Sequence, residues 1–456
     1  MERIAMNKLI EWNGNTRKKP LIIWGARQVG KTYLVKELFA KQYYANNFIY
    51  VDCKKEDEIR EFCSKTANAE KIIEYISLRK GKQINEKTLL IFDEVQECPN
   101  IISSLKYFCQ DFREIPVIAT GSMVRIKLQR EMRKRGASES EKFLFPVGKI
   151  NQITIYPMSF DEFLMNNNKI LYDAVKKAYE NRHPLDNEIH ELAMEQVYKY
   201  MLVGGMPEAV EAYIDGENLL EAREILKALY DNYLSDMELY QASQEAVLRS
   251  RVLFQNIYRE LNKETKNFSP GLIAEKSKTR DYATSIQWLT MAHIVNQSFQ
   301  LKEHVTMPLM ADNESNFRLF LGDIGMFSYQ SGINAASFVS SERDNTLSGI
   351  FFENFVANEL VAKEHKLFYW RGRTTAELEF IIESNNKLFP LDVKKGKGTL
   401  NSLEKFSNHN KFECAIKASK NNYGYNQQQK LLTIPFYFIP FLAKELADGT
   451  MGNFPL

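Results

Sequence analysis

The stretch Leu21-Ile22-Ile23-Trp24-Gly25-Ala26-Arg27-Gln28-Val29-Gly30-Lys31-Thr32 decides the fold of the first part of the chain. Its last eight residues fit the pattern G-x-x-x-x-G-K-[ST], and they lie between an apolar run and a helical pattern. Glycine allows such a loop to curl so that backbone N–H groups point inward, while the next helix presents its positive end to the same anion. The stretch therefore predicts a phosphate-binding loop between a strand and a helix.

The chemistry of this loop points to Mg-ATP as its ligand. We expect the Lys31 ammonium to reach the β- and γ-phosphates, and the Thr32 hydroxyl to complete the shell of a Mg²⁺ ion. The other loop residues would contribute mainly their backbone. The candidate ATP-binding residues are Gly25, Ala26, Arg27, Gln28, Val29, Gly30, Lys31 and Thr32.

Three further apolar runs accompany the loop within the first 165 residues. They cover residues 48–51, 89–92 and 116–119, and helical spacing of apolar residues occupies 32–41 and 70–78. The runs are too continuous for one-sided strands, which favours strands covered on both faces. The alternation of strands and helices predicts a wound α/β domain with a parallel sheet.

Polar residues follow two of these runs where each predicted strand ends. Asp93 and Glu94 come directly after the run 89–92. Ligands of open α/β sheets bind at the carboxyl edge, so Asp93 is expected to contact the magnesium shell and Glu94 to orient and deprotonate the attacking water. Thr120 or Ser122, after the fourth run, would sense the γ-phosphate; a simple turn is the alternative.

Overall composition sets limits on the partners and the compartment. The chain has 456 residues, and 60 Lys and Arg against 58 Asp and Glu give a net charge of +2, so any binding of nucleic acid must come from a local patch. Five scattered cysteines favour a reducing cytosol without structural zinc. No apolar run has the length of a membrane span, so we expect a cytoplasmic protein that does not cross a membrane.

The pattern along the chain predicts four domains. Residues 1–165 would form the ATPase domain, 166–245 a helical connector or lid, 246–345 a winged-helix-like domain, and 346–456 a C-terminal α/β domain. Lys276, Lys278 and Arg280 begin the candidate recognition helix, where DNA contacts are expected, although such modules also serve as packing or partner surfaces. The basic stretch 125–142 is a second candidate for nucleic-acid contact, or a mobile loop.

Four charged residues near the C-terminus form a further constellation. Glu377 and Glu379 lie two apart on one predicted strand, and Asp392 and Lys394 do the same on the next. If the strands are neighbours, two carboxylates could hold Mg²⁺ while the lysine steadies the attacking hydroxide, which suits cleavage of a phosphodiester. A charged face at a sheet surface is the alternative.

Several blocks of sequence together resemble the AAA-type P-loop ATPases of bacteria and archaea, in which the ATPase domain precedes a C-terminal domain of unassigned role. The blocks span nearly the whole chain: residues 26–32, 92–96 with 99–100, 120–122, 156–160 with 162–163, 204–208, 321–325, 352–354 and 370–371. These ATPases usually carry Gly-Arg before the Tyr-Pro pair, where this chain has Gly148-Lys149. Because lysine lacks the planar fork of arginine, Lys149 cannot contact a phosphate group in the same bidentate way.

The C-terminal constellation is similar to the PD-(D/E)xK restriction-endonuclease family. The resemblance assigns Glu379, Asp392 and Lys394 to the three motif positions, with Glu353 on a helix as a fourth. Related ATPases usually have Asp in place of Glu379 and Glu in place of Asp392, so both carboxylate lengths are exchanged.

These patterns lead to one main functional hypothesis and two alternatives. The main hypothesis is an ATPase that hydrolyses Mg-ATP to drive or switch a C-terminal module that binds DNA or a partner. The alternatives are an ATP-gated, metal-dependent DNA nuclease effector and a nucleotide-switched regulator that binds DNA or protein. The sequence assigns no arginine finger, so a neighbouring subunit or a protein partner would supply one.

Overall fold

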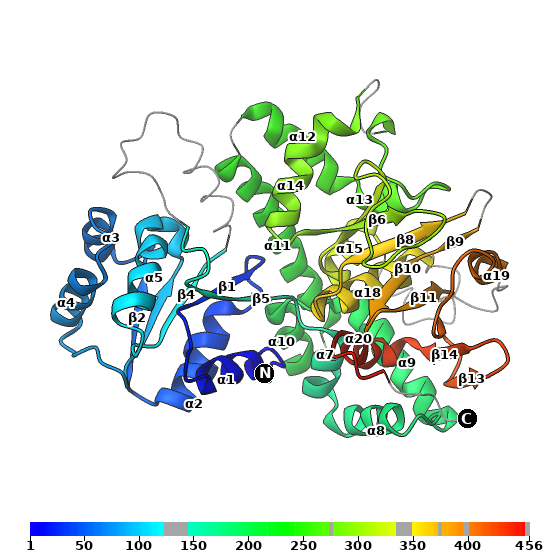
Figure 1. Ribbon diagram of the computed structural model, residues 1–456, viewed down its shortest axis with the longest axis horizontal. Coiled ribbons are helices and arrows are strands. Elements are labelled where there is room, and N and C mark those ends of the chain that lie inside the picture. Colours follow the sequence, from blue (N-terminus) through cyan, green and yellow to red (C-terminus); the bar gives the residue numbers. More distant parts are fainter. Residues whose placement is uncertain are drawn as a thin grey trace. The chain divides into compact units, whose positions relative to one another are not determined.

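The computed structural model describes residues 1–122, 145–216, 218–241, 243–272, 277–333, 349–372, 376–394 and 401–451 (Figure 1). The chain separates into two compact units, Arg3–Tyr156 and Pro157–Leu456, the latter together with Met1–Glu2. The basic stretch 125–142 and Lys276 lie outside the described residues. Within the described part of the chain, no helix is both long and apolar enough to cross a membrane.

The first unit contains a five-stranded parallel sheet in the order β2-β3-β4-β1-β5. Its strands are β1 Leu21–Gly25, β2 Phe48–Asp52, β3 Leu89–Asp93, β4 Val117–Thr120 and β5 Asn151–Ile155. Its helices are α1 Met6–Gly14, η1 Tyr33–Ala40, α2 Lys41–Tyr44, α3 Asp57–Ser64, α4 Ala69–Lys80, η2 Val95–Glu97 and α5 Pro99–Asp111. The predicted parallel α/β sheet is confirmed.

Burial on the strands follows their position in the sheet. All residues of β1, β3 and β4 are buried, as predicted for inner strands. The same prediction is wrong for β2, where buried and half-buried residues alternate because β2 is an edge strand. The strand β5 was not predicted, since Asn151–Ile155 has no continuous apolar run and only Ile155 is buried.

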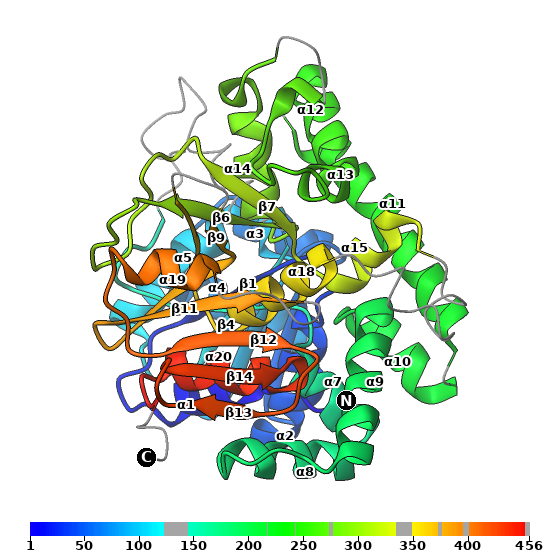
Figure 2. The ribbon, with the colours of Figure 1, turned by 90° about the vertical axis from the view of Figure 1, so that its right-hand side faces the viewer.

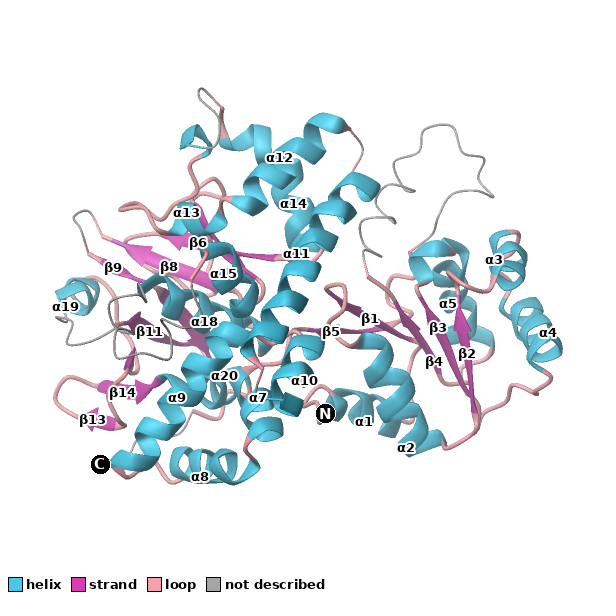
Figure 3. Cartoon of the chain, turned by 180° about the vertical axis from the view of Figure 1, so that it is seen from behind, coloured by secondary structure: helices cyan, strands magenta, loops and turns pink. Residues whose placement is uncertain are grey.

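Alternate residues of β1 divide the core of this unit into two layers. Ile22 and Trp24 pack into the cluster that includes apolar residues of α4 and α5, and Leu21 and Ile23 pack into the cluster of α1 and η1. Figure 3 shows α4 and α1 on opposite sides of the strands. Burying one such aliphatic side chain contributes about 1.5–3 kcal/mol, which explains why the predicted strands are so apolar.

The two predicted helices form with differences in detail. The segment 32–41 contains a π-helix, η1, followed by the short α2, whereas an ordinary helix was expected. The wider turns begin immediately after the phosphate loop, a place where local departures from α-helix are common. The helix α4 extends slightly beyond the predicted 70–78, because Asn68 caps its start by accepting from the Lys71 N–H and Gly81 ends it with φ 61°.

The second unit is helical in its first half. Its earlier helices are α7 Phe160–Asn167, α8 Lys169–Glu180, α9 Asn187–Val203, α10 Pro207–Gly216, α11 Leu219–Tyr240, α12 Gln244–Gln255, α13 Ile257–Leu261, η4 Pro270–Leu272, η5 Thr279–Tyr282 and α14 Ala283–Met291. Residues 204–206 separate α9 from α10. Asn256 separates α12 from α13.

Two sheets and the later helices complete this unit. The strands are β6 Val295–Leu301, β7 Phe317–Leu321, β8 Leu367–Arg371, β9 Glu377–Leu378, β10 Phe380–Ser384, β11 Lys387–Val393, β12 Ala415–Ser419, β13 Gly424–Asn426 and β14 Leu431–Pro435. The helices are α15 Ile324–Ser331, α18 Gly349–Ala362, α19 Asn401–Ser407, η6 Phe436–Phe438 and α20 Ile439–Ala447.

The sheet orders are β7-β6-β8-β9 and β10-β11-β12-β14-β13. Figure 2 shows β11, β12, β14 and β13 side by side. The strand β6 pairs antiparallel with β7 and parallel with β8. The segments expected as a winged helix and as a C-terminal α/β domain therefore share one sheet.

Blocks of sequence that are far apart along the chain meet in the core of this unit. Met158 N–H donates to the Gly205 carbonyl at 2.7 Å, and the Tyr200 hydroxyl donates to the Met158 carbonyl at 2.7 Å. Gly205 N–H donates to Asp323 Oδ2 at 2.7 Å. A Cβ atom on Gly205 would lie 2.0 Å from the Met158 carbonyl oxygen, so only glycine permits this approach.

Glu359 is a carboxylic acid that is buried in the same core. Its Oε1 accepts the Phe160 N–H at 2.9 Å, and the neighbouring Asp161 forms an ion pair of 3.0 Å with Lys363. Burial raises the pKa of Glu359 to about 8, and the charge of Asp161 adds to the shift. Glu359 is therefore largely protonated at neutral pH in the folded protein.

This protonation makes stability depend on pH. Between pH values near the ordinary glutamate pKa and about 8, the folded state binds more protons at Glu359 than the unfolded state, so the free energy of unfolding falls as the pH rises. We expect Glu359→Gln, which keeps an acceptor for Phe160, to reduce this slope in urea denaturation. The exposed Glu211→Gln serves as control. An unchanged slope in Glu359→Gln would contradict the prediction.

Candidate functional site

The loop formed by residues 25–32 joins β1 to η1. Three of its residues have a left-handed backbone: Gly25 at φ 146°, Gln28 at φ 60° and Gly30 at φ 87°. A Cβ atom on Gly25 would lie 2.3 Å from the carbonyl oxygen of Ile155 on the adjacent β5. Both the backbone angle and the close strand therefore require glycine where the loop begins.

The Lys31 side chain lies inside the curled loop. Its ammonium donates to the carbonyl oxygens of Gly25 at 3.1 Å and Ala26 at 2.7 Å, and the residue is buried. Burial lowers the pKa of Lys31 to about 8, although the charges of Glu94 and Asp93 favour the protonated form. A desolvated cation in this position is suited to meet an anion.

The carboxylate of Asp93, at the end of β3, accepts hydrogen bonds from three hydroxyl groups. Thr32 Oγ1 and the Tyr50 hydroxyl each donate to Asp93 Oδ2 at 2.7 Å, and Thr120 Oγ1 donates to Asp93 Oδ1. The predicted residues Thr32, Asp93 and Thr120 thus lie together, and Ser122 is buried two residues further along. Tyr50 was not predicted, because its proximity depends on the pairing of β2 with β3.

Glu94 lies next to this carboxylate with an unusual backbone. Its φ is 52°, its N–H donates to Asp93 Oδ1 at 3.0 Å, and the Gln96 side-chain amide donates to its Oε2. Burial raises the pKa of Glu94 above its ordinary value, while the Gln96 hydrogen bond opposes this shift. A carboxylate with a raised pKa is better suited to accept a proton.

The residues at the end of β3 fit a magnesium ion. Mg²⁺ prefers hard oxygen ligands, and it is usually bound by one or two carboxylates together with substrate phosphates. The Thr32 hydroxyl and the Asp93 carboxylate supply such oxygens 2.7 Å apart, beside the loop. Their roles as metal ligands stay predictions.

Arg3 stabilises the loop through two hydrogen bonds, and this role was not predicted from the sequence. Its guanidinium donates to the Val29 carbonyl at 3.0 Å and to the Tyr156 carbonyl at 2.9 Å, and the residue is buried. It therefore ties the loop to the residue that follows β5. A single arginine ahead of α1 carries no sequence pattern that would reveal this contact.

The C-terminal constellation also converges in the structure. Phe380 on β10 pairs with Leu391 on β11, which places Glu379 beside Asp392. Lys394 Nζ lies 2.7 Å from Asp392 Oδ1 and 3.8 Å from Glu379 Oε1. The Val393 N–H donates to Glu379 Oε2 at 3.0 Å. The expected proximity is present, and its use in metal binding stays a prediction.

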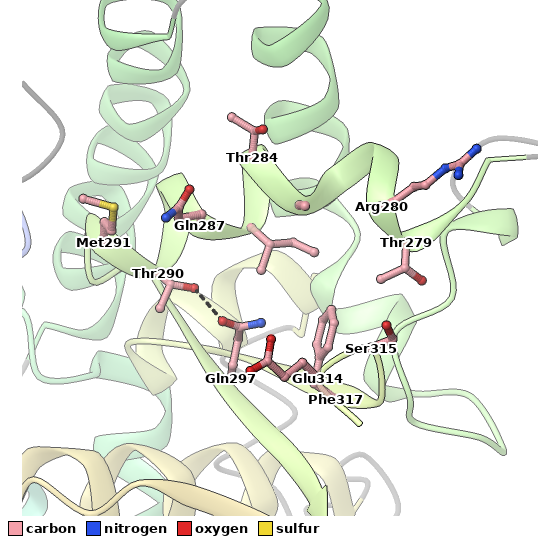
Figure 4. Close-up of a pocket in the computed structure, with 12 residues that line it drawn as sticks. Thr279, Arg280, Thr284, Gln287, Thr290, Met291, Gln297, Glu314, Ser315 and Phe317 are labelled. Carbon is pink, nitrogen blue, oxygen red and sulfur yellow. Dashed lines mark hydrogen bonds between the residues drawn. The ribbon is translucent and has the colours of Figure 1, made fainter. Parts of the chain in front are cut away.

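The candidate recognition helix borders a pocket of about 590 Å³ that both polar and apolar residues line (Figure 4). Arg280 extends from η5 at its edge, and Gln287 on α14 and Gln297 on β6 contribute side-chain amides. A second pocket of about 440 Å³ shares Gln297 and Glu314 with it. Lys278 is exposed beside η5. Contact of these residues with DNA stays a prediction.

Comparison with known families divides the chain into three matched regions. Residues 17–164 match the family model of an AAA domain. The match supports a P-loop ATPase domain in the part of the chain that carries the loop and the Asp93 cluster. Residues 194–337 and 348–437 match two domains of unknown function (DUF8612 and DUF4143).

A curated relative comes from Methanocaldococcus jannaschii. This uncharacterized protein, MJ1637, is 25% identical over 222 residues, which cover 46% of the present chain and 42% of the relative. The chain thus matches less than half of that protein. The likeness carries no established activity to this chain.

The backbone at Gly25 gives a direct test of the loop. We expect Gly25→Ala to cost about 1–3 kcal/mol through backbone strain, and to lower both the melting temperature and the affinity for Mg-ATP by a clear margin. Gly14→Ala is the matched control, because nothing lies within 4 Å of a Cβ at that position. Calorimetry with and without nucleotide provides the measurement. A Gly25→Ala variant that behaves like the control would contradict the assigned geometry.

Proposed function

We propose that the chain binds Mg-ATP at residues 25–32 and hydrolyses it to ADP and phosphate. The observation that carries this proposal is the meeting of the Lys31 loop with the hydroxyl-bonded Asp93 carboxylate. The match of residues 17–164 to an AAA domain supports it.

The residues of the site suggest a division of tasks. Lys31 would neutralise charge on the β- and γ-phosphates, and the loop backbone would hold them. Thr32 and Asp93 would hold Mg²⁺, which supplies further charge neutralisation when bound. Glu94 would orient the attacking water and accept its proton for in-line attack on the γ-phosphate. Thr120 fixes the Asp93 carboxylate by donating to it.

The expected rate of ATP hydrolysis depends on an arginine finger, which the sequence of this chain does not assign. A general base contributes about 10²- to 10⁴-fold, whereas an arginine finger contributes about 10³- to 10⁵-fold. Lys149 stands where similar ATPases have arginine, and its ammonium lacks the bidentate fork. We propose that a neighbouring subunit or a partner supplies the arginine, so that the isolated chain hydrolyses ATP slowly.

The second unit is proposed to be the part that ATP drives or switches. The pocket beside Arg280, which amide, hydroxyl and apolar side chains line, is where we propose that DNA or another partner binds. Phosphate release with and without DNA separates an engine from a switch, because a partner stimulates an engine whereas a regulator turns over slowly. The nuclease alternative depends on the charged residues near Glu379.

Removal of the loop cation tests nucleotide binding. We expect Lys31→Ala to abolish measurable Mg-ATP affinity, because the phosphates lose their buried positive partner. Isothermal titration against Mg-ATP provides the measurement, and Lys71→Ala, at an exposed lysine of α4, is the control. Equal titration curves for Lys31→Ala and wild type would remove the proposed function.

Removal of the proposed base separates binding from hydrolysis. We expect Glu94→Gln to bind Mg-ATP as tightly as wild type but to release phosphate about 10²- to 10⁴-fold more slowly. Single-turnover hydrolysis is the measurement, and Glu70→Gln at an exposed position of α4 is the control. If Glu94→Gln turns over at the wild-type rate, another group is the base.

A further inference from the structure

A buried set of charged residues surrounds the C-terminal carboxylates, and we call it the charge cluster. Its members are Glu353, Glu377, Glu379, Asp392, Lys266, Arg318 and Lys394. No side chain in the cluster is more than 27% exposed. Charges removed from water to this extent require partners of opposite sign.

Lys266 contacts two of these carboxylates at once. Its ammonium lies 2.6 Å from Glu353 Oε1 and 3.7 Å from Glu377 Oε1. Glu353 comes from α18 and Glu377 from β9, so a single cation joins a helix to a strand. Burial alone would lower the pKa of Lys266, but Glu353 and Glu379 hold it above its ordinary value.

Arg318 is a second protein cation that forms an ion pair with Glu377. The guanidinium on β7 is 1% exposed, and its Nη2 lies 2.5 Å from Glu377 Oε2. It also lies over the Tyr369 ring, with the central carbon 3.9 Å from the ring centroid. Loss of its carboxylate would therefore leave a buried guanidinium without a counter-charge.

Protein cations therefore face every carboxylate of the charge cluster. Lys394 contacts both Asp392 and Glu379, while Lys266 and Arg318 contact Glu353 and Glu377. Three protein cations thus face the four carboxylates of the charge cluster.

The contacts of the charge cluster differ from the metal centre that the endonuclease resemblance implies. Glu353 Oε2 and both carboxylate oxygens of Asp392 accept no hydrogen bond within the described part of the chain, but magnesium needs several oxygen ligands that surround it together. Within the described part of the chain, no group of three or more His, Cys, Asp or Glu residues is placed to hold a metal ion. Glu353, the helix-borne carboxylate of the expected site, instead bonds to Lys266.

We infer that Lys266 and Arg318 are fixed counter-ions of the charge cluster, and that Lys266 takes the place of a divalent metal at Glu353. Both cations precede residue 345, whereas all four carboxylates follow it. The segment expected as a winged helix therefore neutralises the nuclease-like site of the segment that follows it. The cluster joins the two segments and does not cut DNA in this arrangement.

Metal binding by the full chain without nucleotide tests the inference. We expect Mn²⁺ titrations followed by electron paramagnetic resonance to be identical for wild type and Asp392→Asn, because no metal binds at Asp392. We also expect Lys266→Met to lower the melting temperature by several degrees and to gain a stabilising response to Mn²⁺. Lys263→Met is the control, because Lys263 pairs with Glu260 outside the cluster.

Two results would overturn the inference. One is a Mn²⁺ site in wild type that Asp392→Asn removes, together with Mn²⁺-dependent cleavage of plasmid DNA that the same substitution abolishes. The other is a Lys266→Met variant with the stability of wild type and no response to Mn²⁺. If Lys266→Met fails to fold, the comparison of wild type with Asp392→Asn still decides, since it needs no change at Lys266.

Discussion

The first unit depends on the buried carboxylate of Asp93. A carboxylate that is 4% exposed is stable only if hydrogen bonds replace its lost water. Thr32 from the loop, Tyr50 from β2 and Thr120 from β4 provide those bonds. The strand order places these groups around the end of β3, so the arrangement that stabilises the charge also builds the candidate magnesium site.

The sequence predicted the parts of this site that follow local rules. The loop and the acidic step at Asp93 could be recognised because each follows a continuous apolar run that must be an inner strand. Tyr50 and Arg3 could not be predicted, because their contacts arise from strand pairing and from chain segments more than 25 residues away. The edge strand β5 was not predicted either, because its exposed residues form no apolar run.

In the second unit, too, contacts that follow from short sequence patterns could be predicted, whereas contacts between distant segments of the chain could not. Alternation predicted that Glu377 and Glu379 would share one face of a strand, and Asp392 and Lys394 one face of the next. The first part is wrong, because Glu377 lies on β9 and Glu379 follows it before β10 begins in the other sheet. The pairing of β10 with β11 still brings Glu379, Asp392 and Lys394 together. Nothing in that local pattern pointed to Lys266 or Arg318. Arg318 lies on β7, and the pairing of β6 with both β7 and β8 joins segments that the sequence suggested were separate. The segment that carries Lys266 is tied to β7 by the Phe268 N–H, which donates to the Phe317 carbonyl.

One rule of electrostatics separates the two acidic sites. A buried carboxylate must be compensated, and the nature of its partners determines what else it can bind. Neutral hydroxyls donate to Asp93, so its negative charge would be available to the Mg²⁺ ion that we propose beside the phosphate loop. Lysine and arginine hold the carboxylates of the charge cluster, so a metal ion there would have to displace buried cations. The same residue type is thus proposed to bind an ion in one unit, whereas it forms internal ion pairs in the other.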